Sequence, residues 1–183
     1  METILHLFIT NTCRHDCPLC CNKLYVIDKI PVVTVELLKR ADTVCLTGGE
    51  PLLIHEGSFY TFTRNLRMQY PNIKNLYVYT SGYGLQFMWR TLEQLVEMKC
   101  INGINVAPKD KLDWWEFQNA LKGRHGALNG ESNRLYVFDE QRKNFEELNL
   151  NLEGINIEVL GRKWQQVFNT PDNEYFVRLP ILF

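Results

Sequence analysis

Residues 43–51 read Thr-Val-Cys-Leu-Thr-Gly-Gly-Glu-Pro, and this stretch gives the most direct indication of the fold. A short apolar run, typical of a buried strand, leads straight into two glycines, a glutamate and a proline. Paired glycines let the backbone adopt positive φ angles and approach a ligand closely, and the proline stiffens the exit. We therefore expect a strand that ends in a ligand-binding loop made by Gly48, Gly49, Glu50 and Pro51.

Strand-like and helix-like segments alternate along the rest of the chain. Short apolar, β-branched and aromatic runs predict six strands, at residues 5–10, 43–47, 76–80, 101–106, 134–138 and 155–160. Helical spacing and capping patterns predict helices between them, at residues 34–41, 59–70, 85–96 and 141–148, with one more around Trp115 that Asp113 and Glu116 would cap. This alternation predicts an α/β fold with parallel strands and right-handed crossovers, and six such units would form an open, partial (β/α)6 barrel.

Length and composition indicate a single domain. The chain has 183 residues, of which 45% are apolar, enough for a real core. We expect one domain over residues 1–183, with a core of about residues 1–161 and an apolar-rich tail, residues 162–183, that packs on the core or forms a partner surface.

Charge and hydropathy exclude some function classes. The net charge of −1 gives no strong signal for nucleic-acid binding, and no apolar run is long enough for a membrane helix. The N-terminus lacks the features of a secretory signal. In a cytoplasmic chain, six cysteines suggest metal binding or catalysis before disulfides, so we expect a cytoplasmic protein with a metal site.

Three cysteines follow the first predicted strand closely. Residues 12–20 read Thr-Cys-Arg-His-Asp-Cys-Pro-Leu-Cys, which gives Cys13, Cys17 and Cys20 the spacing C-x3-C-x2-C. A four-iron cluster normally takes four cysteine ligands, so three thiolates would leave one iron open to a ligand that is not protein. His15 is a potential fourth ligand, but a filled fourth position would leave no open iron, so we do not expect it to bind there.

The cysteine loop, followed by a strand and the Gly-Gly-Glu-Pro loop, resembles the radical S-adenosylmethionine (SAM) superfamily. The resemblance implies that Cys13, Cys17 and Cys20 hold a [4Fe-4S] cluster, that SAM chelates its open iron, and that residues 48–51 contact SAM. It also implies a reductant such as flavodoxin or ferredoxin, whose electron cleaves SAM to methionine and a 5′-deoxyadenosyl radical that takes hydrogen from a substrate. Both loops follow the carboxyl ends of predicted strands, where parallel α/β proteins place their ligands.

The same resemblance extends to positions further along the chain. Thr80 and Ser81 end the third predicted strand where many family members have Thr-Asn-Gly, which would place them near SAM, although an ordinary strand-to-helix turn explains them as well. Asn105, at the end of the fourth strand, would meet the ribose or carboxylate of SAM. The nearby Lys109 fits a solvated surface lysine better.

Several alternatives stay open from the sequence. Leu19 stands where the family commonly has an aromatic residue, and Cys21 has no clear role. The substrate is either a peptide or protein, or a small molecule, and residues 122–131 form the most flexible candidate for a lid. A cluster- and SAM-binding sensor or interaction protein without catalysis would use the same residues. A structural zinc protein is a more remote alternative, because it would need a second ligand pair.

Overall fold

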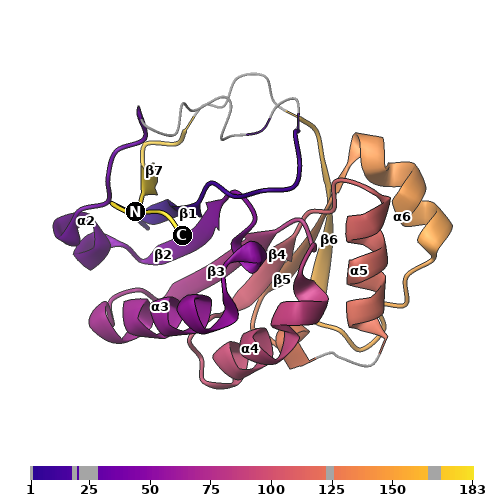
Figure 1. The fold of residues 1–183 in the computed structure, drawn as a ribbon, viewed down its shortest axis with the longest axis horizontal. Coiled ribbons are helices and arrows are strands. Elements are labelled where there is room, and N and C mark those ends of the chain that lie inside the picture. The colour runs from indigo at the N-terminus through magenta and orange to yellow at the C-terminus, as the bar shows by residue number, and fades with distance from the viewer. Residues whose placement is uncertain (1, 18–19, 21–28, 123–125, 165–169) are drawn as a thin grey trace.

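The protein is built around one open sheet of parallel strands (Figure 1). The computed structural model describes residues 2–17, 20, 29–122, 126–164 and 170–183. Within these residues seven strands pair in the order β6-β5-β4-β3-β2-β1-β7, and every pairing is parallel. Their bounds are β1 (Ile4–Thr10), β2 (Thr43–Gly48), β3 (Asn75–Thr80), β4 (Gly103–Val106), β5 (Asn133–Phe138), β6 (Ile157–Arg162) and β7 (Glu174–Arg178). The predicted α/β fold with parallel strands is therefore confirmed.

The helices cover one face of this sheet. They are α2 (Val35–Arg40), α3 (Glu56–Gln69), α4 (Leu85–Glu97), α5 (Lys111–Leu121) and α6 (Arg142–Leu148), with short 3-10 turns η2 (Pro51–Leu53), η3 (Gly126–Leu128) and η4 (Asp139–Gln141). From β1 to β6 each strand lies beside its predecessor, so right-handed crossovers bring the connecting helices to the same face. Successive helices from α3 to α6 contact one another there, as Figure 1 shows. None of the described helices has the length and apolar character needed to span a membrane.

Alternation along the strands gives the sheet two different faces. Side chains such as Leu5, Leu7 and Ile104 are fully buried and pack with the helices in the hydrophobic core. The opposite side, which we call the inner face, carries aromatic, basic and polar side chains that are largely absent from that core. The inner-face residues are His6, Phe8, Cys45, Tyr77, Tyr79, Asn105, Arg134, Tyr136, Phe138, Glu158, Arg162, Glu174, Phe176 and Arg178.

The six predicted strands and the four helices with predicted ranges are all present, with ends that differ by a few residues. The predicted cap of α5 is wrong. Asp110 is the N-cap, and its side chain accepts hydrogen bonds from the backbone N–H groups of Leu112 and Asp113. Asp113 and Glu116 lie inside the helix and are buried, because the helix begins three residues earlier than the sequence suggested.

The C-terminal tail contributes a strand that the sequence analysis did not predict. β7 pairs with β1, on the side away from β2, and the yellow arrow in Figure 1 lies beside the indigo one. Further along, the N–H of Phe183 donates to the carbonyl of Ile9 at 2.9 Å. A five-residue segment with charged ends carries a weak strand signal, and its place depends on the free edge of β1. Leu19, Cys21 and part of the proposed lid lie outside the described residues.

Candidate functional site

The two loops singled out in the sequence lie against each other at the carboxyl edge of the sheet. Pairing of β1 with β2 continues to Thr10 and Gly48. Beyond it, the N–H of Gly49 donates to the carbonyl of Thr10, and the N–H of Glu50 donates to the carbonyl of Thr12, both at 2.7 Å. The Gly-Gly-Glu-Pro loop is therefore bonded to the residue immediately before Cys13.

This close approach requires both glycines. Gly48 has a φ of +120°, and a Cβ atom there would lie 2.3 Å from the carbonyl oxygen of Thr10. A Cβ atom on Gly49 would lie 2.1 Å from the carbonyl oxygen of Thr12. Backbone atoms cannot yield as a flexible side chain can, so any side chain at these positions would push the two loops apart.

Glu50 locks the end of β2 to the end of β3. Its side chain is 1% exposed, and its carboxylate accepts from the hydroxyl of Thr80 (2.6 Å), from the N–H and hydroxyl of Ser81 (2.7 and 2.8 Å) and from the N–H of Leu52 (3.1 Å). Burial raises the pKa of Glu50, and these donors oppose the rise. Thr80 and Ser81 thus hold Glu50, which is a structural role that the sequence did not reveal.

The three cysteines differ in exposure, and the charge of one thiolate affects the pKa of its neighbours. Cys13 is exposed, while Cys17 and Cys20 are half-buried, and the N–H of Cys20 donates to the carbonyl of Cys17 at 3.3 Å. Burial raises the pKa of the Cys13 and Cys17 thiols, and repulsion from the neighbouring thiolates adds to this. A bound cation would outweigh that repulsion and lower the pKa of the thiols. This favours the deprotonated thiolate, which is the form that binds metal.

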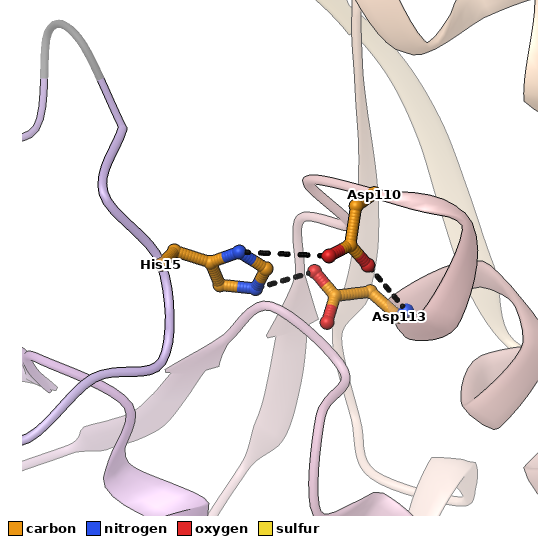
Figure 2. Close-up of side chains that lie close together, drawn as sticks. All are labelled: His15, Asp110 and Asp113. Carbon is orange, nitrogen blue, oxygen red and sulfur yellow. Dashed lines mark hydrogen bonds and ion pairs between the residues drawn. The ribbon is translucent and has the colours of Figure 1, made fainter.

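Arg14 and His15, inside the cysteine loop, anchor it to the start of α5, and Figure 2 shows the contacts of His15. The imidazole of His15 points toward that helix, with Nε2 2.9 Å from Oδ2 of Asp113. Arg14 forms ion pairs with Asp110 and, at 3.2 Å, with Asp113. Asp113 is fully buried and also accepts from the backbone N–H of Lys109 at 2.8 Å. Sequence reasoning missed this anchor, although the aspartates three residues apart at the start of a helix were a visible signal.

The same aspartates and histidine are also the one group of potential metal ligands whose atoms lie within 4.8 Å of one another in the described residues. Arg14 already supplies positive charge to both carboxylates, so a cation would have to compete with its guanidinium. We assign Asp110, Asp113 and His15 to anchoring. The cysteine sulfurs do not gather this tightly within the described chain, as they would around a single zinc ion; a cluster of several irons spreads its thiolates more widely.

Asn105 is the predicted site residue with the clearest unmet bonding capacity. It lies on the inner face of β4, between Tyr79 and Arg134 in register, and is 1% exposed. Neither atom of its amide has a hydrogen-bond partner within the described structure. Buried polar groups are rarely left in this state, so a ligand is the natural partner for this amide.

Lys109 is not the solvated surface lysine that the sequence favoured. Its ammonium lies 3.6 Å from the ring centre of Phe138 and 4.7 Å from that of Trp164, so two aromatic rings hold it. Burial raises the pKa of Cys17, and the positive charge of Lys109 is the largest effect that opposes this rise. Lys109 therefore packs on Phe138 of the inner face and acts through its charge on Cys17 of the cysteine loop.

These residues fit an iron–sulfur cluster with SAM. Soft thiolate donors suit iron. The loop that carries them is hydrogen bonded to the Gly-Gly-Glu-Pro loop and ion paired with α5. The buried amide of Asn105, which has no partner within the described residues, is suited to hydrogen bond a polar ligand. A cavity of about 670 Å³ lies elsewhere, between β7 and the segment that leads into α2; its lining includes Ile30, Leu37 and Phe176 but neither motif. The comparisons with known proteins add no identification: no protein-family model matches the chain, and no similar sequence was found among curated proteins.

Proposed function

We propose that this chain is a radical SAM enzyme built on a partial (β/α)-barrel, with Cys13, Cys17 and Cys20 as ligands of a [4Fe-4S] cluster. When bound, the cluster would supply the electron that cleaves SAM to methionine and a 5′-deoxyadenosyl radical, which takes hydrogen from the substrate. The electron itself would come from a reductant such as flavodoxin or ferredoxin.

One observation carries this proposal. The loop with three cysteines and the Gly-Gly-Glu-Pro loop are separated by a strand and a helix, yet their backbones are hydrogen bonded at the carboxyl edge of a parallel sheet. A ligand that touched both loops would lie where such sheets bind their ligands. A structural zinc site would not explain why the second loop is glycine-rich and held so close to the first.

The chain's own residues would bind, orient and shield the cofactors. Arg14 and His15 fix the part of the loop between Cys13 and Cys17 on α5, without needing a bound cluster. Glu50 uses its carboxylate within the protein, which leaves the backbone of residues 48–51, rather than this carboxylate, to face SAM. Asn105 would hydrogen bond the ribose or carboxylate of SAM.

The test is anaerobic. The purified chain is reconstituted with iron and sulfide, given SAM and dithionite, and assayed for 5′-deoxyadenosine by mass spectrometry. We expect 5′-deoxyadenosine from the wild type and from Cys100→Ala, which removes a buried thiol of the core remote from the motif, and none from Cys17→Ala. Equal product from Cys17→Ala would overturn the cluster assignment. A loaded four-iron cluster that never cleaves SAM would favour the sensor instead.

A further inference from the structure

The backbone of Lys109 is held on both sides. Its N–H donates to Oδ2 of Asp113 at 2.8 Å, and its carbonyl accepts from the side-chain amide of Gln141 at 2.7 Å. The amide oxygen of Gln141 also accepts from the indole N–H of Trp114 at 3.0 Å, and Trp114 is 1% exposed. The Lys109 side chain therefore starts from a base that is tied to α5 and to η4 at the same time.

Two aromatic rings fix the other end of this side chain. The ammonium lies 3.6 Å from the ring centre of Phe138 and 4.7 Å from that of Trp164, and the two rings stack on each other with centres 4.4 Å apart. An aromatic ring attracts a cation through its quadrupole and has no net charge. These contacts therefore hold the ammonium in one place without neutralising its charge.

The same aspartate joins Lys109 to the cysteine loop. Asp113 accepts from the Lys109 backbone and is also the partner of His15 at 2.9 Å and of Arg14 at 3.2 Å, two residues inside that loop. Arg14 faces two carboxylates, which offset its charge, whereas the Lys109 ammonium lies on aromatic rings. The field of Lys109 reaches the loop, because its charge is the largest effect that opposes the rise in the pKa of Cys17.

We propose that Lys109 raises the reduction potential of the cluster by supplying a fixed positive charge beside the cysteine loop. The inference rests on the function proposed above and adds to it a residue that belongs to neither motif. Reduction transfers one electron from the external reductant, such as flavodoxin or ferredoxin, and makes the cluster more negative by one unit of charge. A cation held nearby stabilises the reduced form more than the oxidised form, and the net charge around a cluster is one determinant of its potential.

The expected size of the effect follows from Coulomb's law. At the effective dielectric constant of a partly buried site, one unit charge several ångströms away changes the equilibrium constant of a one-electron step roughly tenfold. Lys109→Met removes the charge and keeps an unbranched side chain, so we expect reduction to be about tenfold less favourable, which lowers the midpoint potential by about 59 mV. Lys109→Gln is a second neutral variant with the same expectation. Lys109→Arg keeps the charge and can stack on the rings, so its potential is expected to stay close to that of the wild type.

A redox titration measures this potential directly. The full chain and its variants are loaded with iron and sulfide under anaerobic conditions and poised at a series of potentials without SAM, and the reduced cluster is quantified by electron paramagnetic resonance. Lys74→Met is the control, because it removes the same charge from a side chain that is 74% exposed and lies just before β3, at the opposite edge of the sheet. Water and salt screen a charge at such a position, so this variant is expected to match the wild type.

Several results would overturn the inference. Equal midpoint potentials in the wild type and the two neutral variants would exclude an effect of the charge, and an equal fall in Lys109→Arg or Lys74→Met would assign the shift to packing or to overall charge. Weaker SAM binding by Lys109→Met at an unchanged potential would make Lys109 a contact of the cofactor instead. Iron and sulfide contents, measured first, separate the two proposals: a wild type without a four-iron cluster would overturn both, whereas a loaded cluster with equal potentials would overturn only this inference.

Discussion

Removing the Thr80 hydroxyl tests whether the Glu50 carboxylate holds the two strand ends together. Thr80→Val keeps the shape of a side chain that is 5% exposed and deletes two hydrogen bonds, one donated to Glu50 at 2.6 Å and one accepted from the N–H of Gly82 at 2.9 Å. A bond to a charged group and a neutral bond together correspond to about 2–4 kcal/mol of unfolding free energy. For a chain of this size the melting temperature is expected to fall on the order of 10 °C.

The matched control is another buried threonine, whose hydroxyl makes no hydrogen bond within the described residues. Thr63 on α3 is fully buried, and its hydroxyl has no hydrogen-bond partner in the described structure. Thr63→Val removes an unpaired polar atom, so we expect stability to rise by about 1 kcal/mol. Urea denaturation followed by circular dichroism measures both variants. If Thr80→Val and Thr63→Val had the same effect, the importance of the Glu50 contacts would be refuted.

Three further predictions concern how the loops are held. Gly49→Ala is expected to lose about 2–4 kcal/mol of stability and to bind less iron after reconstitution, because its Cβ would meet a backbone oxygen of the cysteine loop. Gly57→Ala, on α3, is expected instead to gain up to about 1 kcal/mol of stability, because no atom lies closer than 3.5 Å to its Cβ. Asp113→Asn is expected to cost about 1–3 kcal/mol in urea denaturation and to lower iron retention, since it weakens the buried end of the anchor; unchanged iron retention would contradict the anchoring role. Lys109→Met is expected to lower the melting temperature slightly, by loss of a cation–π contact of about 0.5–1 kcal/mol, whereas Lys109→Arg is expected to retain it.

Some of the candidate site was readable from the sequence, and some was not. The cysteine spacing and the two glycines are local patterns, and the sequence placed them correctly at the ends of two strands. The roles of Thr80 and Ser81 were only half visible, because the turn explains their residue types while their contacts with Glu50 come from another strand. The cap of α5 was assigned three residues late, since Asp113 matches a capping pattern and is in fact used by the cysteine loop.

The sequence by itself determined the alternation of strands and helices and the residue types of both loops, three cysteines in one and Gly-Gly-Glu-Pro in the other. These features depend on spacing and residue type over a few neighbouring positions, where backbone geometry and side-chain chemistry act locally. Only the tertiary structure decided the anchor between Arg14 and Asp113, which are 99 residues apart, and the pair of His6 with Glu174 on β7, 168 residues apart. Contacts at such separations form only once the sheet brings distant strands together, so no local pattern in the chain records them.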